Sequence, residues 1–426
     1  MTAVREAVAF ASFGLTISLA LTRPRLRHHT LGPAAAAAAG VTLTLVAGSV
    51  TPDDVRHAAT ELGRPLVTVA SIMVTTAAAV HLGVIQRLAA AVVARAGDSV
   101  TRLFNLVFVL GAVTAAVLNN DGAILLLTPL VVMAVRGLYP DKPEIVIPFA
   151  FAVFLAAGVA PLMISNPMNM IVADAAGIGF NRYAAHMIPV SVPGWLLTLW
   201  ILRRIFRAEL DAAGSPTAST EEALPWTGGQ RAMILLLLTV LAAYPVVSYL
   251  GGPIWAVASA GALLAIVLCW RQGVAGPREL VLRGVAWQVL AFLFGVFVLA
   301  HGLRNAGVVD WLSDSYQDAG VGLIGFASAI GSALIDNHPM AILNLFAIEQ
   351  TPTLGERHIL GALIGGDLGP RLLPIGSLAG LLWFDSLRRH DVHVTLRQFV
   401  SVGATVTAPG LLLSLSLLRL VADVIP

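Results

Sequence analysis

Two long apolar stretches decide the fold, because polar residues interrupt each of them near its middle. Residues 103–135 read LFNLVFVLGAVTAAVLNNDGAILLLTPLVVMAV, and residues 321–349 read VGLIGFASAIGSALIDNHPMAILNLFAIE. Each stretch is longer than the roughly 20 residues that one membrane-crossing helix needs. The interruptions are LNNDG at 118–122 and DNHP at 336–339. We interpret both stretches as re-entrant helical hairpins, which enter and leave a membrane on the same side.

The composition places the whole chain in a membrane. Of its 426 residues, 57% are hydrophobic and 12% are charged, whereas soluble domains carry about 25% charged residues. The net charge of +2 comes from arginines in short loops, which indicates topology and gives no reason to expect nucleic acid as a partner. Apolar stretches besides the hairpins lie at 8–22, 31–50, 66–92, 144–176, 186–206, 231–250, 253–270, 287–303, 358–386 and 398–422. The sequence therefore predicts an all-α polytopic membrane protein.

The distribution of arginine and lysine predicts how the chain is threaded, because short cytoplasmic loops are rich in basic residues. With the N-terminus outside and both hairpins counted as non-crossing, ten spans remain, and most basic loop residues fall on the cytoplasmic side. The C-terminus then also lies outside. The first hairpin opens to the cytoplasm and the second to the outside, so we predict two inverted repeats in a bacterial inner membrane.

This threading divides the chain into four parts. Residues 1–65 form N-terminal helices, 66–207 the first inverted repeat, and 231–426 the second. The longest polar stretch, residues 208–230, contains the turn-forming triplet GSP at 214–216 and reads as a cytoplasmic linker between the repeats.

Each hairpin is followed by an apolar stretch with breaks of its own, ISNPMN at 164–169 in the first half and GGDLGPRLLPIGS at 365–377 in the second. We interpret both as discontinuous transmembrane helices. Discontinuous helices paired across inverted repeats mark a substrate site near the midplane. Amide and hydroxyl side chains there offer donors and acceptors without the cost of burying a charge, which suits a small, hydroxyl-rich solute. The predicted substrate ligands are Asn119, Asn120, Ser165, Asn166, Asn169, Asn337, His338, Gly376 and Ser377.

Titratable groups at the breaks are candidates for proton coupling. Asp121 and Asp367 are the carboxylates nearest the predicted site, and a buried carboxylate can carry a coupled proton. Both could instead cap a half-helix N-terminus, and Asp367 could be neutralised by Arg371 one helical turn away. His338 could relay protons or simply pack. We predict Asp121, Asp367 and Arg371 as the proton-coupling set.

The same motifs resemble the signatures of the ArsB-type arsenite and antimonite efflux permeases, within the wider ion-transporter superfamily. LNNDGA at 118–123 with TP at 128–129 is similar to the first signature. SN at 165–166, Asn169 and the AD pair at 173–174 resemble the second, and GDLGPR through PIGSL at 366–378 is the most specific match. The family usually has Asn-Met-Pro where this chain has Asn337-His338-Pro339, and Lys where it has Arg371.

The resemblance implies secondary efflux of arsenite or antimonite as the neutral trihydroxide, in exchange for protons. Cys269 is the only cysteine, so a tris-thiolate site is excluded and hydrogen bonding to hydroxyls is the available mode of recognition. No resident metal or cofactor is expected. The resemblance leaves open a soluble ATPase subunit as a partner, although the chain itself has no Walker motif.

Three alternatives remain at this point. The chain could be a sodium- or proton-coupled carrier of organic anions, although Arg371 is the only basic residue predicted at depth. A passive solute channel is the second alternative, because sequence alone does not establish alternating access. An intramembrane hydrolase built on Ser165 and His338 is the third, and nothing in their spacing favours it; we therefore predict no enzymatic activity.

Overall fold

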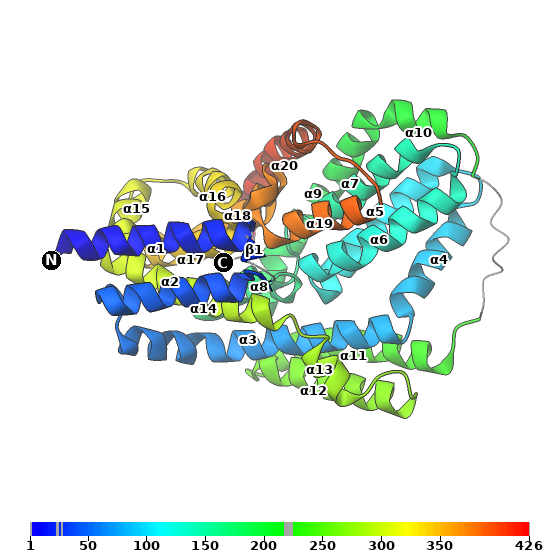
Figure 1. Ribbon diagram of the computed structural model, residues 1–426. Helices are drawn as coiled ribbons and strands as arrows, with labels where there is room; N and C mark the ends of the chain where they lie inside the picture. Colours follow the sequence, from blue (N-terminus) through cyan, green and yellow to red (C-terminus); the bar gives the residue numbers. More distant parts are fainter. Residues whose placement is uncertain (1, 23–24, 27–28, 217–224, 426) are drawn as a thin grey trace.

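The structure, a computed structural model, describes residues 2–22, 25–26, 29–216 and 225–425. The described chain is built from helices, apart from a short antiparallel pairing of Arg25–Leu26 (β1) with His29–Thr30 (β2). Most of the helices run along the long direction of the molecule (Figure 1). The predicted all-α fold is confirmed.

Eight helices among the described residues are long and apolar enough to cross a bilayer. Two of them form the first hairpin. The other six are α3 (Pro52–His81), α9 (Phe180–Ile205), α11 (Gly228–Tyr249), α12 (Ile254–Arg271), α14 (Trp287–Asn305) and α20 (Leu396–Val424). The remaining continuous helices are α1 (Thr2–Thr22), α2 (Pro33–Ala47), α4 (Val84–Ala96), α10 (Arg207–Ala213), α13 (Pro277–Leu282) and α15 (Val308–Tyr316).

Three details differ from the sequence interpretation. The apolar stretch 66–92 is not one helix, because Gly83 adopts a positive φ of 72° and separates α3 from α4. Helix α3 runs without interruption through the predicted boundary at residues 65 and 66. The predicted linker at 208–230 contains most of α10 and the start of α11, and its residues 217–224 lie outside the described part.

The two hairpins point toward each other. The first consists of α5 (Val100–Leu118) and α6 (Asn120–Leu138), the second of α16 (Val321–Ile335) and α17 (Asn337–Gln350). A single residue joins the helices of each pair, Asn119 in the first and Asp336 in the second. In Figure 1, α5 and α6 occupy the right-hand part of the molecule and α16 and α17 the left-hand part. The predicted opposite orientation of the hairpins is confirmed.

Both discontinuous helices are present. In the first half, η1 (Pro143–Ile145) and α7 (Val146–Ala156) are followed by a break, the short 3-10 turn η2 (Met163–Ser165) and α8 (Pro167–Ala175). In the second half, α18 (Glu356–Leu368) is followed by the 3-10 turns η3 (Gly369–Arg371) and η4 (Pro374–Gly376) and then by α19 (Leu378–Arg389). Each break exposes helix ends whose backbone groups lack partners within the helix.

Glycines let the second hairpin pack closely on the discontinuous helix that follows it. Gly361, Gly365 and Gly369 recur every four residues along α18 and its extension. A Cβ atom on Gly365 would collide with the carbonyl oxygen of Gly325 in α16, and one on Gly369 with that of Ala329. Small residues at this spacing allow two helix backbones to approach within a membrane. Hairpin and discontinuous helix are thereby held as one packed unit.

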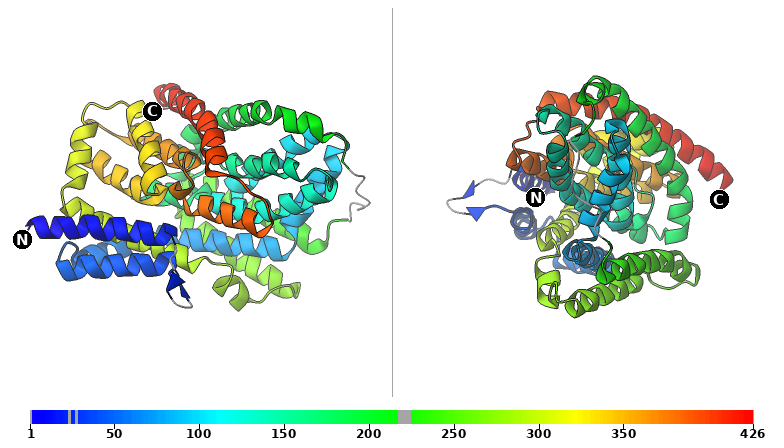
Figure 2. Two further views of the ribbon diagram at one scale, coloured as in Figure 1. Left: turned by 45° about the horizontal axis from the view of Figure 1, so that its top comes forward. Right: turned by 90° about the vertical axis from the view of Figure 1, so that its right-hand side faces the viewer.

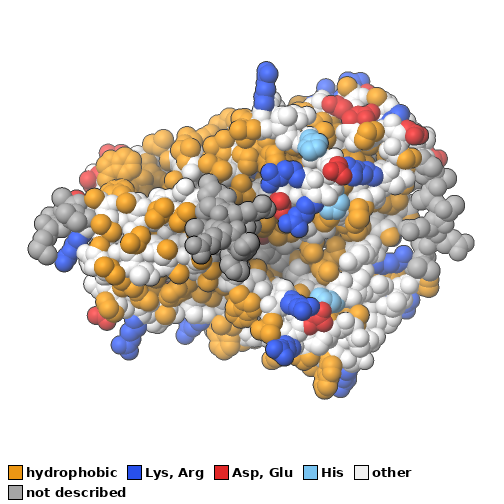
Figure 3. All heavy atoms as spheres, in the orientation of Figure 1, with side chains coloured by type: hydrophobic (Ala, Val, Ile, Leu, Met, Phe, Trp, Pro, Cys, Tyr) orange, Lys and Arg blue, Asp and Glu red, His pale blue; other side chains and the backbone are white. Residues whose placement is uncertain are grey.

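The surface is suited to lipid. Helices α11 and α12 lie along one side of the molecule, as Figure 1 and the end-on view of Figure 2 show. Large apolar side chains on them are exposed, including Leu235, Leu263 and Trp270. Hydrophobic side chains also cover much of the face in Figure 3, with charged side chains gathered at the ends and right of centre. Such exposed apolar area is stable only against an apolar solvent or partner.

Candidate substrate site

Asn119 forms the turn of the first hairpin. Its φ of 141° is a conformation that few residues other than glycine adopt. Its side-chain Oδ1 accepts hydrogen bonds from the backbone N–H groups of Asp121 and Gly122, at 2.8 and 3.4 Å. Asn119 therefore caps the N-terminus of α6. The next two residues, Asn120 and Asp121, make up the rest of the tip.

Asp336 holds the same position in the second hairpin, with a positive φ of 77°. Its Oδ1 accepts from the backbone N–H of His338 at 3.0 Å and lies 3.0 Å from Nδ1 of the same residue. Asp336 is 2% exposed and His338 is 5% exposed. The sequence interpretation did not include Asp336 in the site. Superimposing the two tip sequences, with Asn119 on Asp336, would have found it.

The two tips lie within electrostatic range of each other. The charges of both His338 and Asp336 act on Asp121. Each tip also adjoins the break of its own repeat. Ser165 donates its hydroxyl to the carbonyl oxygen of Ala116 in the last turn of α5, at 2.7 Å. In the second half, a Cβ on Gly376 would lie 3.0 Å from the Cα of Ala333 in α16.

Asp367 joins the two discontinuous helices. Its carboxylate lies in the last turn of α18 and accepts three hydrogen bonds from the first repeat. The donors are the backbone N–H of Ala160 at 2.9 Å, the amide of Asn166 at 2.8 Å and the amide of Asn169 at 2.9 Å. Three N–H donors converging on one carboxylate satisfy its oxygens as acceptors. Asp367 thus connects the breaks directly, and its role in proton coupling stays a prediction.

Tyr183 of α9 completes this cluster and was not identified from the sequence. Its hydroxyl accepts from Asn169 at 2.6 Å and donates to the carbonyl oxygen of Ala160 at 3.1 Å. Tyr183 is fully buried. No local pattern marks it, because it lies in a continuous apolar helix and meets the break only through tertiary packing.

Arg371 does not form a direct ion pair with Asp367, which was one of the alternatives that their spacing left open. No salt bridge within 4.0 Å joins them among the described residues, because α18 ends at Leu368 and the chain tightens into η3. The guanidinium instead donates to the carbonyl oxygens of Leu155 and Ala157, at 2.7 and 3.2 Å, where α7 ends. A cation at a helix C-terminus is stabilised by the helix dipole. The charges of Arg371 and Asp367 still interact over a longer distance.

Seven of the nine predicted ligands divide into two kinds. Asn166 and Ser377 cap the second half-helix of each break, accepting from Met168 N–H at 3.1 Å and Gly380 N–H at 3.1 Å. Together with Asn119 and Ser165 they hold the backbone of the site. Other buried side-chain atoms have no hydrogen-bond partner within the described protein: Asn169 Oδ1, Asn337 Oδ1, His338 Nε2 and, beside the second break, Ser332 Oγ. These atoms are available to a polar solute, since unsatisfied buried polar groups otherwise cost stability.

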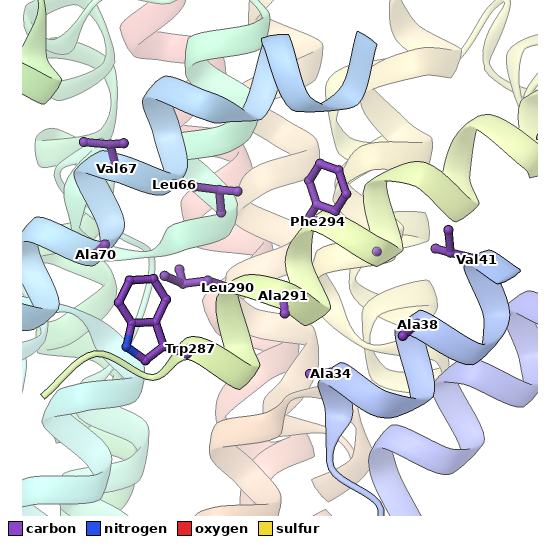
Figure 4. Close-up of a pocket in the computed structure, with 11 residues that line it drawn as sticks. Ala34, Ala38, Val41, Leu66, Val67, Ala70, Trp287, Leu290, Ala291 and Phe294 are labelled. Atoms are coloured by element: carbon purple, nitrogen blue, oxygen red, sulfur yellow. The ribbon is translucent and has the colours of Figure 1, made fainter. Parts of the chain in front are cut away.

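A groove away from the hairpin tips and breaks does not compete for the role of substrate site. It encloses about 620 Å³ between α2, α3 and α14 and is lined by apolar side chains such as Leu66, Leu290 and Phe294 (Figure 4). Its one side chain with a polar atom, Trp287, donates to the carbonyl oxygen of Val281 at 3.1 Å. The groove gives a hydroxylated solute nothing to bind.

Paired hairpins and paired breaks around buried polar groups define a multi-pass membrane transporter of the inverted-repeat class. The YdaH transporter of Alcanivorax borkumensis, whose crystal structure reveals an unusual topology, has a similar fold, with a TM-score of 0.58 and 16% identity over 99% of this chain and 98% of its own. The family model of ArsB, the arsenical pump membrane protein, matches residues 8–421. The chain belongs to this family.

Relatives in the family are similar over nearly their whole length. The arsenical pump membrane protein of Escherichia coli (strain K12) is 32% identical over 97% of this chain and 98% of its own. The arsenical pump membrane protein of Yersinia enterocolitica is 31% identical over the same shares. The resemblance stated from the motifs is confirmed.

Proposed function

We propose that this chain exports arsenite or antimonite from the cytoplasm of a bacterium in exchange for protons. The solute is bound as its neutral trihydroxide, by hydrogen bonds to its hydroxyl groups. The observation that carries the proposal is the set of buried polar atoms without a partner in the described protein at the first break, on Asn169, and at the second hairpin tip, on Asn337 and His338. The names of the relatives support an arsenical as the cargo.

Recognition of the solute through its hydroxyl groups follows from the side chains that the protein has at the site. Three thiolates would bind trivalent arsenic tightly, but the chain has one cysteine, Cys269. It lies buried in α12, with Sγ 3.6 Å from the carbonyl oxygen of Ala78. A site made of amide and imidazole groups binds weakly and releases readily, as transport requires.

The same geometry argues against an organic anion as the cargo. An anionic substrate needs a free cation, and Arg371 is the basic residue at the breaks. This cation is partly engaged, since one of its terminal nitrogens donates to the carbonyls of both Leu155 and Ala157, while its Nε has no partner within the described protein. Carboxylates at Asp121, Asp336 and Asp367 would oppose an anion further.

For orientation, we propose that both termini lie outside the inner membrane and that the first hairpin opens to the cytoplasm. Proton binding then occurs at the hairpin tips, where Asp121, Asp336 and His338 interact electrostatically. A proton entering from the outside favours release of the solute there, which couples the two fluxes.

Arsenite uptake into everted membrane vesicles tests the proposal. We expect accumulation when a proton gradient, acid inside, is imposed, and loss of accumulation when an uncoupler collapses it. A passive channel would equilibrate arsenite without accumulation under either condition. If uptake without a proton gradient occurs only when ATP is supplied, exchange of arsenite for protons is excluded as the driving mechanism. If no arsenite is taken up under any condition, arsenite is excluded as the cargo.

A further inference from the structure

The imidazole of His338 has one nitrogen engaged and one free. Nδ1 lies 3.0 Å from Oδ1 of Asp336. An ionised carboxylate only accepts hydrogen bonds, so Nδ1 carries the hydrogen. Nε2 is then the nitrogen with the lone pair when the ring is neutral, and it is buried without a partner within the described protein. Asp336 thereby selects the tautomer of His338.

The two protonation states of Nε2 have opposite hydrogen-bonding character. In the neutral ring, Nε2 accepts a hydrogen bond from a hydroxyl group, O–H to N. When a proton binds, the same atom becomes an N–H donor, and no lone pair is left to accept the hydroxyl. A solute hydroxyl and a proton therefore cannot occupy this lone pair at the same time.

From this geometry we propose that a hydroxyl of the solute and the coupling proton compete for the lone pair of His338 Nε2. The inference rests on the proposed function and names the atom at which exchange occurs. No covalent bond to arsenic changes. The incoming proton forms the Nε2–H bond, and the solute leaves with its own hydroxyl hydrogen.

The charges around His338 favour this role. Those that act on the imidazole come from Asp336 at its own tip and Asp121 at the tip of the first hairpin. Both are acidic, so they stabilise the imidazolium against the cost of burial. Helix α16 carries no titratable side chain. Among the described residues, the titratable side chains of the other helices packed on α17 are not among the groups whose charges act on the imidazole: Asp174 of α8, His301 and Arg304 of α14, Asp310, Asp314 and Tyr316 of α15, and Glu356, Arg357, His358 and Asp367 of α18.

Competition at one atom gives exchange in the correct direction. On the more acidic outer side, the proton takes the lone pair and the solute is released. On the cytoplasmic side, the proton is lost more readily and a hydroxyl of the next solute molecule takes its place. Two ligands that exclude each other have a positive, unfavourable coupling free energy, which is the thermodynamic requirement for antiport.

The test is arsenite binding to the purified, full-length protein at a series of pH values, with proton release followed by an indicator dye in weak buffer. For the wild type, we expect the Kd for arsenite to rise about tenfold per pH unit below the titration of His338, with up to one proton released per arsenite bound there. Arsenite binding by the wild type that releases no proton at any pH would overturn the inference.

His338→Gln sharpens the test, since its Oε1 can accept the solute hydroxyl but does not titrate. We expect this variant to bind arsenite with a pH-independent Kd and no proton release, and to exchange arsenite without gradient-driven accumulation. His186→Gln is the matched control, because His186 is equally buried but lies in α9 with both ring nitrogens bonded. Proton release that persists in folded His338→Gln would place the proton elsewhere.

Asp336→Asn tests the electrostatic role of Asp336 through the pH profile of arsenite binding, which a change in packing alone would not shift. The substitution keeps the size of the side chain and removes one of the two acidic charges beside the imidazole. We expect the pH profile of arsenite binding to move toward lower pH. An unchanged profile in a folded Asp336→Asn protein would contradict the role of this pair. Absence of arsenite binding by the wild type would instead refute the proposed function.

Discussion

The two halves of the molecule share one backbone plan and differ in chemistry. In each half, one residue with positive φ turns the hairpin and caps its second helix, Asn119 in the first and Asp336 in the second. In each, a short 3-10 turn precedes an extended capping residue that starts the second half-helix, Asn166 in the first and Ser377 in the second. The frame is therefore two-fold in its local structure.

The side chains on this shared backbone plan differ in chemistry between the two halves. The first break contributes neutral groups, the amides of Asn166 and Asn169 and the backbone of Ala160. The second contributes the charges, and both Asp367 and Arg371 reach across to the first half. Symmetric backbones can thus provide two similar access states, while the charged side chains that link the two breaks, Asp367 and Arg371, both come from the second half.

The largest effect is expected at the contact that joins the halves. Asp367→Asn would place an NH2 group among three N–H donors, so at least one donor loses its acceptor and the charge of Arg371 loses its nearest compensation. We expect loss of arsenite uptake in vesicles and a fall of about 3–5 kcal/mol in the free energy of unfolding. Uptake and thermal denaturation of the purified protein measure these effects.

Asp385→Asn is the control for that prediction. Asp385 lies in α19 of the same half and forms exposed ion pairs with Arg388 and Arg389. Such surface pairs contribute less than about 1 kcal/mol, so stability and uptake should stay close to wild type. If Asp367→Asn has as little effect on uptake and stability as Asp385→Asn, the contact of Asp367 with the first half is not what holds the two halves together.

The second prediction separates charge from hydrogen bonding at Arg371. Arg371→Gln removes the cation and shortens the side chain, so the carbonyls at the end of α7 lose the donor that reaches them, and we expect it to cost about 1–3 kcal/mol of stability. Uptake should fall with it, because the first break is no longer fixed. Arg371→Lys keeps the cation at the helix C-terminus and should lose less in both measurements. Equal losses in the two variants would show that the charge itself contributes nothing.

The third prediction concerns packing of the hairpins. Gly365→Ala forces a methyl group against backbone of α16, and overpacking of this kind costs about 1–3 kcal/mol. Gly111→Ala in the first hairpin meets the Cβ of Ala156 at 2.9 Å and otherwise makes ordinary contacts with Val153, so it should cost less. Gly137→Ala, with nothing near its added methyl, is the control. Melting temperatures that rank in another order would refute the tighter packing of the second hairpin.

The sequence predicted the frame because the frame is locally encoded. A polar run inside an apolar stretch has one inexpensive solution in a membrane, a turn or break covered by protein, so LNNDG and DNHP located both hairpin tips. The end of α3 was missed. It depends on Gly83, whose positive φ turns the chain between His81 and Gln86, and both polar residues had been interpreted as part of one apolar stretch.

Contacts between the halves were harder to predict, because they join residues far apart in the chain. Spacing within α18 suggested an Asp367–Arg371 pair, but the helix ends between them and each residue finds partners in the first half. Tyr183 had no sequence signal at all. Asp336 had one, its alignment with Asn119, which only comparison of the two tips would reveal.

The smallest effect is expected at Cys269, which lies in the second half but outside the breaks. Its side chain is buried where α12 packs on α3, with Sγ 3.6 Å from the carbonyl oxygen of Ala78. A serine hydroxyl is slightly smaller and can donate to that oxygen, so Cys269→Ser should fold normally and change stability by less than about 1 kcal/mol. Arsenite uptake and Kd should match the wild type, because hydroxyl recognition at the breaks uses no thiol. A folded Cys269→Ser protein that no longer binds arsenite would show that sulfur holds the metalloid, and the assignment of the site to amides and His338 would then be wrong.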